Sequence, residues 1–438
     1  MNHTMVMDTM TQRFKTTFIA LLLIMPLLVL GACQTGGGYR PHASVPQAPA
    51  EQNPSILSSP SSDQLLGNQQ SPATPTSHIT NLPTVKVGIL LPLSGQHQKL
   101  GDSMLKAAQM ALFEIGHANL ELIPRDTKGT AAGAQAAAQS AIDSGAQILL
   151  GPVFAPAVRS AKPVAQRARI NMIAFSTDWT LADSNTYVMG FMPFDQVKRI
   201  TSFAAGHGIT RVGVLAPDTN YGRIVSNAFN AAAPHYNITL TENTRYPAGT
   251  SNLAPIVKTF TRYDARKSAG ALAQTPFDAV LMPVGDQDAR AIASLLSHYD
   301  LPPRSVRRIG TGLFDEASLA SEANLEGAWF AAPDPAARHS FEQRFINTYG
   351  TRPPRLATLA FDATALSAIL ARRGLQSTGR PAFDHSAITN PNGFSGLDGI
   401  FRFRPDNTAE RGLAVLEFRR GRLGVIDQAP KSFQNITQ

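Results

Sequence analysis

The sequence predicts an α/β fold of two doubly wound parallel-sheet lobes with an interlobe cleft. Near-continuous apolar runs of strand length recur along the chain, as expected for parallel strands that are covered on both faces. Segments with helical spacing or a high alanine content separate these runs, and the connections are short. The alternation occurs in two series, and 438 residues with 43% hydrophobic and 16% charged residues suffice for more than one core.

The first series begins abruptly at Val85. Residues 85–91 (VKVGILL) form an apolar strand, Pro92 ends it, and residues 101–115 carry apolar side chains at helical spacing. The next elements are expected in this order: a strand at 120–123, a helix at 130–144, a strand at 148–150, a helix at 157–168 and a strand at 171–174. Strand, helix and strand with short connections predict right-handed crossovers within one parallel sheet.

The second series follows residue 194 and ends in a different pattern. The expected elements are helices at 197–206, 221–233, from about 253, 286–299, 335–349 and 356–373, and strands at 211–215, 238–246, 277–284, 308–311 and 327–331. From Gly393 onward the chain changes to short strands at 400–403, 413–418 and 423–426. Two such α/β units leave a cleft at the carboxyl ends of their strands, which is the usual ligand position in open sheets.

These elements divide the chain into five parts. We expect a signal peptide (1–32), a lipidated N-terminus with a disordered Pro/Ser-rich linker (33–84), a first lobe (85–194 plus 331–390), a second lobe (195–330 plus 391–428) and a tail (429–438). Hinges are expected where the chain passes between the lobes, near residues 190–194, 331–335 and 390–393. Closure about these hinges would be the working motion of the protein.

The first 33 residues have the pattern of a lipoprotein signal. Two basic residues precede the apolar run 18–30, which is short for a permanent membrane span. Residues 30–33 (LGAC) look like a bacterial lipobox, and Cys33 is the only cysteine in the chain. We therefore expect Cys33 to be acylated and to hold the protein on a membrane. Gln34 resembles the outer-membrane sorting pattern, which predicts the periplasmic side of the outer membrane of a Gram-negative cell envelope.

Several classes of function lack their signals in this sequence. One cysteine provides no intrachain disulfide, Cys-based zinc site or iron–sulfur cluster. No zinc-protease, P-loop, dinucleotide-binding or nucleophile-elbow motif is present. Asp286 and Asp288 suit a helix N-terminus, and we do not take them as a metal site. The net charge of +8 is scattered without interleaved aromatic residues, so we expect no nucleic-acid partner. From the missing motifs we also expect no metal, no cofactor and no catalytic activity.

Residues 85–95 (VKVGILLPLSG) are similar to the opening of leucine/isoleucine/valine-type periplasmic binding proteins, the type I fold. Four further stretches match that family in order: 148–153 (ILLGPV), 171–177 (NMIAFST), 211–222 (RVGVLAPDTNYG) and 396–403 (GLDGIFRF). The resemblance spans roughly residues 85–426. It implies the two-lobed fold and a small ligand held in the cleft between the lobes.

The resemblance also implies where a ligand would be contacted. The candidate ligand-binding residues are Ser94, Gly95, Gly151, Ala155, Ser176, Thr177, Tyr221 and Asp286. Each also has a structural reading, because turns, helix N-caps and lobe packing use the same residue types. Residues 151–156 (GPVFAP) contain two prolines and no hydroxyl, and no carboxylate precedes Asp315 where the family pairs the substrate ammonium group. A free branched-chain amino acid is therefore less expected than the fold alone suggests.

Two functions remain open at this point. Within the family, the LLPLSG opening and the LGPV turn on a chain with a lipidation signal look closest to penicillin-binding-protein activator lipoproteins. That subgroup implies a regulator of peptidoglycan synthesis whose partner is a penicillin-binding protein. The alternative is the substrate-binding lipoprotein of a branched-chain amino acid-type ABC transporter, with an ABC permease as its partner. The outer-membrane signal and the weakened anchors favour the first function, and the overall similarity to transport receptors favours the second.

Overall fold

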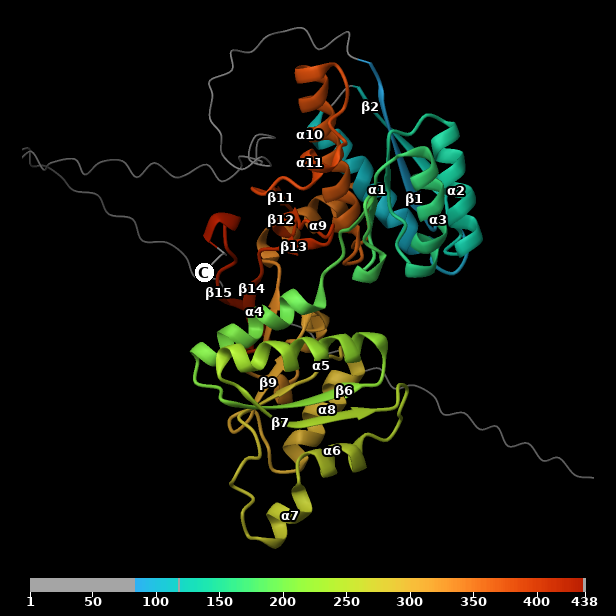
Figure 1. Ribbon diagram of the computed structural model, residues 1–438. Helices are drawn as coiled ribbons and strands as arrows, with labels where there is room; N and C mark the ends of the chain where they lie inside the picture. The colour runs from blue at the N-terminus through green and yellow to red at the C-terminus, as the bar shows by residue number, and fades with distance from the viewer. Residues whose placement is uncertain (1–82, 117–118, 436–438) are drawn as a thin grey trace, which may run out of the picture. The chain divides into compact units, whose positions relative to one another are not determined.

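Two parallel sheets with the same strand order carry the fold (Figure 1). The computed structural model describes residues 83–116 and 119–435. The first sheet has the order β2-β1-β3-β4-β5, and all its neighbouring strands are parallel. Its strands are β1 (Val85–Leu91), β2 (Leu120–Asp126), β3 (Ile148–Leu150), β4 (Met172–Ala174) and β5 (Thr186–Val188). The strands predicted at 85–91, 120–123, 148–150 and 171–174 are confirmed, whereas β5 has no counterpart in the prediction.

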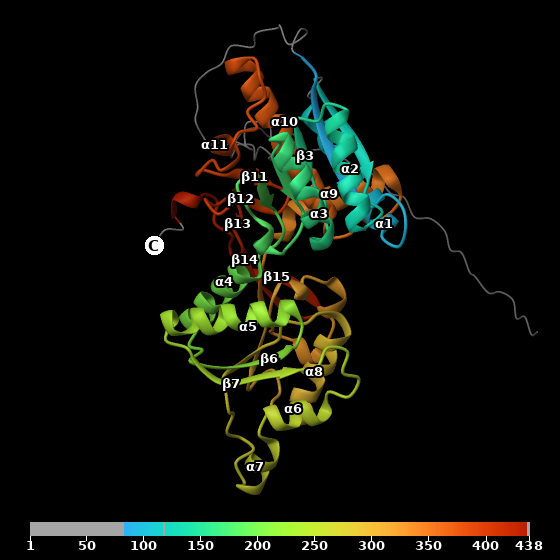
Figure 2. The ribbon, with the colours of Figure 1, turned by 45° about the vertical axis from the view of Figure 1, so that its right-hand side comes forward.

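Helices cover both faces of the first sheet (Figure 2). On one face lie α2 (Ala131–Asp143) and α3 (Ala155–Ala168), and on the other lie α1 (Gln98–Ile115) and α10 (Ala357–Thr378). A further helix, α9 (Pro335–Tyr349), packs its phenylalanines against α1 and α10. Helix α2 begins where Thr130 Oγ1 accepts a hydrogen bond of 3.0 Å from the Gly133 amide, a typical N-cap.

The second sheet repeats the order of the first and adds two antiparallel strands, giving β15-β14-β10-β9-β8-β6-β7. Its strands are β6 (Arg211–Pro217), β7 (Thr239–Tyr246), β8 (Ala279–Leu281), β9 (Arg307–Gly310), β10 (Trp329–Ala332), β14 (Ala414–Arg419) and β15 (Arg422–Asp427). All of them fall on predicted strands. The late strands β14 and β15 therefore complete a sheet whose other strands end at residue 332, which requires the chain to leave this lobe and return.

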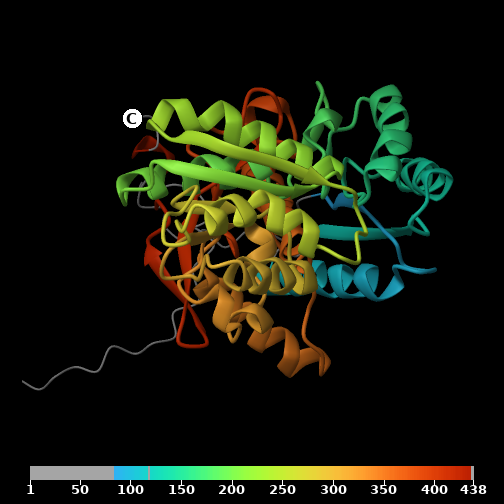
Figure 3. The ribbon, with the colours of Figure 1, turned by 90° about the horizontal axis from the view of Figure 1, so that it is seen from below.

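The second sheet is also covered on both faces, as Figure 3 shows. Helices α4 (Pro193–Gly206) and α5 (Asn220–Ala232) contribute to one core, and α6 (Ala254–Phe260) and α8 (Asp286–His298) contribute to the other. A short helix, α7 (Tyr263–Ser268), follows α6. Burial on both faces explains why the inner strands β6, β8 and β10 are rich in consecutive apolar residues, whereas the edge strands β7 and β15 are largely exposed or half-buried.

A third, small antiparallel sheet lies between α10 and β14 in the sequence. Its strands are β11 (Phe394–Gly396), β12 (Gly399–Phe403) and β13 (Ala409–Arg411), and the short helix α11 (His385–Ile388) precedes them. Phe394, Phe401 and Phe403 of this sheet belong to the hydrophobic core of the first lobe. The structure therefore divides the segment 391–428, which we assigned as one block to the second lobe: residues 394–411 pack with the first core, and residues 414–427 join the second sheet.

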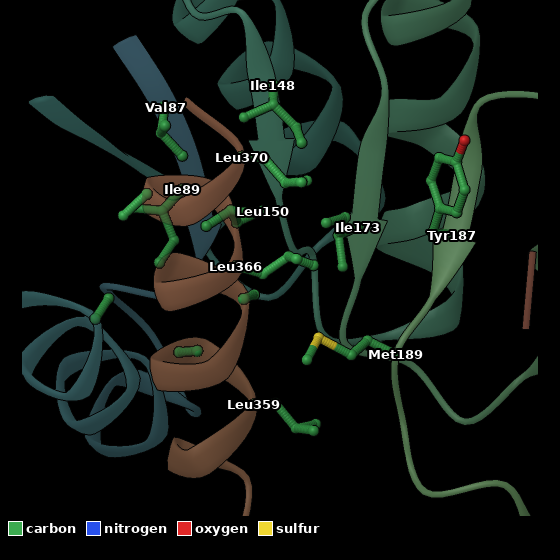
Figure 4. Close-up of a cluster of buried hydrophobic side chains, with 14 of the residues drawn as sticks. Val87, Ile89, Ile148, Leu150, Ile173, Tyr187, Met189, Leu359, Leu366 and Leu370 are labelled. Atoms are coloured by element: carbon green, nitrogen blue, oxygen red, sulfur yellow. The ribbon is translucent and has the colours of Figure 1, made fainter. Parts of the chain in front are cut away.

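The core of the first lobe is built between the sheet and α10 (Figure 4). Val87 and Ile89 of β1 and Leu150 of β3 face Leu366 and Leu370 of α10, and all five side chains are almost fully buried. Seventeen of the 22 residues of α10 are buried. A helix buried on nearly every side explains why its sequence lacks a strong amphipathic pattern.

The predictions for the N-terminal segment lie outside the described residues. They comprise the signal peptide, the acylation of Cys33 and the linker as far as residue 82. Among the helices of residues 83–116 and 119–435, none has the length and hydropathy needed to cross a membrane.

Candidate functional site

All of the predicted ligand-binding residues lie at the carboxyl ends of parallel strands. In the first sheet, Ser94 and Gly95 follow β1, Gly151 and Ala155 follow β3, and Ser176 and Thr177 follow β4; in the second sheet, Tyr221 follows β6 and Asp286 follows β8. In open α/β sheets, ligands bind outside the carboxyl ends of the strands. The chain therefore places both groups where a ligand of this fold is expected.

The loop after β1 is organised by a carboxylate at the end of β2. Ser94 Oγ donates a hydrogen bond of 2.6 Å to Asp126 Oδ2, and the amides of Leu93 and Lys128 donate to Asp126 Oδ1 at 2.9 and 2.7 Å. Burial acts to raise the pKa of Asp126, but these hydrogen bonds outweigh it and the pKa lies below its ordinary value. Because the Ser94 hydroxyl proton is committed to Asp126, this hydroxyl offers its lone pairs, not its proton, to a ligand.

Two glycines shape the turns at this edge. Gly95 has φ +78°, a left-handed conformation that glycine adopts without strain. Gly151 has φ +85°, and a Cβ at this position would lie 2.3 Å from the Leu90 carbonyl oxygen. Its close approach to β1 thus requires glycine at this turn. The predicted contacts of both residues with a ligand remain predictions.

The segment after β3 presents an aromatic side chain rather than a hydroxyl. Helix α3 begins at Ala155 without a side-chain cap, and Phe154 precedes it. The Phe154 ring lies 4.5 Å from the ring of His97, centroid to centroid, and both rings lie beside Gly129. Pro156 within the first turn of α3 has no amide proton, so the helix offers fewer donors to an anion than a usual N-terminus.

The loop after β4 contains a buried hydroxyl at Ser176. Ser176 is 6% exposed, and its Oγ accepts a hydrogen bond of 3.1 Å from the Asp178 amide, so its proton is available to an acceptor. Asp178 in turn accepts from Thr180 and pairs with Arg159 at 2.6 Å. Next to this loop, Trp179 begins the 3₁₀ helix η2 (Trp179–Leu181) and is 46% exposed. The loop therefore combines a buried hydroxyl with an exposed indole.

In the second lobe, Tyr221 is held by its neighbours. Its hydroxyl donates a hydrogen bond of 2.9 Å to Thr311 Oγ1, which lies directly after β9. Burial raises the pKa of Tyr221 to about 12, so it stays neutral at physiological pH. Thr311 is the N-cap of the 3₁₀ helix η4 (Gly312–Phe314), and the Gly312 amide donates to Oε1 of the buried Gln196 at 2.7 Å. These bonds fix the loop in which Leu313 is 41% exposed.

Asp286 lies at the start of α8, with φ +45°. Its side chain is 78% exposed and pairs with Arg290 one turn later at 2.9 Å. This pairing and the helix N-terminus account for an aspartate at this position without a ligand. No group of three or more residues suited to a metal ion occurs among the described residues.

Asp315 is a buried carboxylate close in sequence to Leu313 of the second lobe, and the sequence did not reveal its environment. It pairs with Arg338 of α9 and, at 3.3 Å, with Arg355 before α10, and its side chain is only 4% exposed. Both arginines are distant in sequence, at separations of 23 and 40 residues, and no local pattern marks them. Because this carboxylate is already neutralised by two guanidinium groups, it is a poor partner for a ligand ammonium group.

Arg355 continues this network into a buried set of charges. Its Nη2 lies 2.8 Å from Asp398 Oδ1, and Arg411 Nη1 lies 3.9 Å from Asp362 Oδ2. Asp362 and Asp398 are both almost fully buried. Burial and the nearby Asp398 raise the pKa of Asp362 to about 7, and Arg411 only partly offsets this. The glycine-rich turn of residues 396–399 therefore contributes its aspartate to an internal charge network.

Comparison with known proteins supplies the family. A family model described as "Periplasmic binding protein" matches residues 84–422. No curated protein matches the chain. Among solved structures, a putative branched-chain amino acid ABC transporter protein from Rhodospirillum rubrum has a TM-score of 0.67 and 17% identity and covers 78% of this chain and 100% of its own.

Two other solved structures show the same relation at similar identity. A leucine-binding protein from Thermotoga maritima has a TM-score of 0.54 and 19% identity, and the alignment covers 78% of this chain and 97% of that one. A solute-binding protein from Rhodopseudomonas palustris, in complex with 3,4-dihydroxybenzoic acid, has a TM-score of 0.57 and 20% identity and covers 79% and 96%. At these identities the likeness concerns the fold.

Proposed function

The chain belongs to the periplasmic binding protein family, and from this premise we propose that it is the substrate-binding component of an ABC importer. The observation that carries the proposal is the placement of Ser94, Ser176 and Tyr221 at the carboxyl ends of strands in two sheets of the same order. Such a protein binds a small solute between its lobes and performs no chemistry on it. The importer function reverses the order of our two sequence-based hypotheses.

The proposed mechanism is closure on the ligand. A solute that contacts both lobes binds the closed state more tightly than the open one and shifts the population toward it. The hinges proposed for this motion lie near residues 190–194, 331–335 and 390–393. In this proposal, acylated Cys33 tethers the protein to the periplasmic side of the outer membrane through the linker.

The side chains at the strand ends favour a ligand without a free ammonium group. Asp315 is engaged by Arg338 and Arg355, and the turn at residues 151–156 has lost hydrogen-bond donors. The groups that remain are the Ser176 hydroxyl, an exposed indole at Trp179 and an exposed Leu313. These groups suit a solute with an apolar or aromatic body and one hydrogen-bond acceptor.

A second candidate is a regulator of peptidoglycan synthesis that biases a penicillin-binding protein. The same engagement of Asp315 favours it, because a regulator of this type has no need for an amino-acid anchor. Co-purification with a bifunctional penicillin-binding protein, together with no response to any solute, would support this candidate over the importer component.

A calorimetric solute screen tests the importer proposal. The panel should contain leucine, isoleucine, benzoate and 3,4-dihydroxybenzoate, followed by wider sets of apolar carboxylates. We expect micromolar binding of at least one solute and a loss of about ten-fold in affinity in Ser176→Ala, because a buried hydroxyl donor is removed. Ser318→Ala, on a short 3₁₀ helix of the second lobe, is the matched control and should bind normally. Failure of the whole panel to bind would argue against the proposal.

A further inference from the structure

At the amino ends of the strands of the first sheet lies a group of arginines whose side chains have no hydrogen-bond or ion-pair partner among the described residues. Arg167 and Arg169 lie at the end of α3, Arg373 lies in the last turns of α10, and Arg380 follows that helix. All four are exposed, and none of their side chains makes a hydrogen bond or ion pair with a described residue. We call these four residues the arginine face. Most other arginines of the described chain pair with carboxylates or carbonyl groups, so this group is distinctive.

Two of these arginines line a cavity at this edge. The cavity has a volume of about 520 Å³ and is bounded by Arg169 and Arg380, by the polar side chains of Gln147 and Asn171, and by Phe383. Gln147 and Asn171 precede β3 and β4, so the cavity lies at the end of the sheet opposite to the candidate ligand residues. It is therefore separate from the site proposed above.

Few acidic groups neutralise this face. Asp384 lines the same cavity, but its carboxylate accepts hydrogen bonds from Ser386 and the Ala387 amide. Asp183, before β5, pairs with Lys162 at 2.8 Å. Helix C-termini favour cations, which accounts for Arg167 in the last turn of α3. Arg380 lies beyond Gly379, the C-cap of α10, so this explanation does not apply to it. An uncompensated positive face attracts an anionic partner.

The path of the chain indicates which anionic partner would bind the arginine face. Pro83 and Thr84, the first described residues, also line the cavity, so the N-terminal segment of the chain leaves the fold at the arginine face. Figures 1 and 2 show the start of β1 beside the end of α10. The 82 residues that precede this point contain the apolar run 18–30 and Cys33, the parts of the sequence that predict attachment to a membrane. The arginine face is thus where the part of the chain that is expected to lead to the membrane enters the first lobe.

We propose that the arginine face docks the first lobe onto an anionic phospholipid surface, where Arg169 and Arg380 donate hydrogen bonds to lipid phosphates. Each arginine near an anionic bilayer contributes about five-fold to the partition coefficient. Docking orients the lobe with the amino ends of its strands toward the lipid and leaves the carboxyl ends, with the ligand residues, on the far edge of the sheet. The attraction is electrostatic and weakens with salt.

Vesicle flotation of the full-length chain tests this proposal. The parent protein carries Cys33→Ala, which prevents acylation, and is mixed with vesicles of phosphatidylcholine with or without phosphatidylglycerol. The readout is the ratio of binding to the two compositions, because the apolar N-terminal run contributes to both. We expect a preference for the anionic vesicles that R169Q/R380Q lowers by roughly 20-fold and that R169K/R380K largely retains.

The control has the same change of charge elsewhere. Arg420 lies in the β14–β15 turn and Arg422 begins β15. Both are exposed and have side chains without a partner in the described chain, so R420Q/R422Q should keep the preference of the parent. Equal preference in R169Q/R380Q and the parent, or an equal loss in R420Q/R422Q, would overturn the proposal. Displacement by inorganic phosphate at constant ionic strength would also overturn it, since the cavity would then be a site for a soluble anion.

Discussion

At the scale of single residues, the edge that should bind a ligand also contains side chains that serve the fold. Asp315 follows β9 at the carboxyl end of its sheet, where a carboxylate could pair with a ligand ammonium group, yet two arginines already pair with it. Ser94 likewise gives its proton to Asp126. Position in an α/β sheet therefore indicates where a ligand binds, whereas the hydrogen bonds decide which side chains remain free to bind it.

Asp315→Asn tests the structural role of this carboxylate. Asparagine keeps the shape but removes the charge, which leaves Arg338 and Arg355 less compensated in a largely buried site. We expect a loss of about 3 kcal/mol in the free energy of unfolding, measured by urea denaturation. Asp264→Asn is the control, because its side chain is 72% exposed in its pair with Lys258, and it should behave like the wild type. A wild-type stability of Asp315→Asn would contradict the assigned role.

Gly151→Ala tests the turn after β3. The substitution places a Cβ against the Leu90 carbonyl and forces alanine into φ +85°, so we expect at least about 2 kcal/mol of destabilisation. Gly424→Ala on β15 is the matched control, because a Cβ there meets no atom within 4 Å. Circular dichroism melting of the two variants compares them directly. If both variants have the melting temperature of the wild type, the turn tolerates a side chain and glycine is not required there.

At the scale of secondary-structure elements, the sequence predicts what is local. The sequence located eleven of the twelve strands of the two large sheets, and burial on both faces gives most inner strands a continuous apolar signal. The strand β5 was missed because Val188 is its only aliphatic residue, so Thr186, Tyr187 and Val188 do not form the apolar run that marks the equally short β3 and β4. The ion network of Asp315, Asp362 and Asp398 was missed for another reason: its partners come together only when α9, α10 and the 396–399 turn have packed.

The contact of α10 with this turn predicts an unusual pH dependence. Asp362 of α10 binds its proton up to about pH 7 in the folded chain, whereas its ordinary pKa is 3.8. Between about pH 4 and 7 the folded state therefore holds a proton that the unfolded state has released, so stability falls as the pH rises through this window. Asp195, whose pKa burial raises to about 6 against the effect of Arg404, contributes with the same sign.

Asp362→Asn should reduce this dependence. The amide oxygen can still accept the bond from the Leu397 amide, now 2.8 Å long, but the side chain cannot ionise. We expect similar unfolding free energies for variant and wild type near pH 4 and a more stable variant near pH 8, measured in urea. Asp427→Asn, at the partly exposed pair with Arg199, should keep the wild-type slope. Parallel pH profiles of Asp362→Asn and wild type would exclude Asp362 as the titrating group.

At the scale of the whole molecule, each large sheet has two functionally different ends. The carboxyl ends hold hydroxyls, exposed Trp179 and Leu313, and the turns that require glycine. At the amino end of the first sheet lie the arginine face and the entry of the chain. The sequence predicted the carboxyl-end residues because parallel strands fix their position. The arginines were not recognised as one surface because they lie on segments about 200 residues apart.

The two tryptophans of the chain provide a direct test of ligand binding to this arrangement. Trp179 is 46% exposed beside Ser176, whereas Trp329 is 7% exposed in β10. A solute that binds at the carboxyl ends of the first sheet, or that closes the lobes, should therefore change the emission of Trp179 and leave that of Trp329 nearly constant. With the solute that gives the largest heat in calorimetry, Trp329→Phe should retain the fluorescence change. Trp179→Phe should lose the change even if it still binds, and an undiminished signal in Trp179→Phe would place the ligand elsewhere.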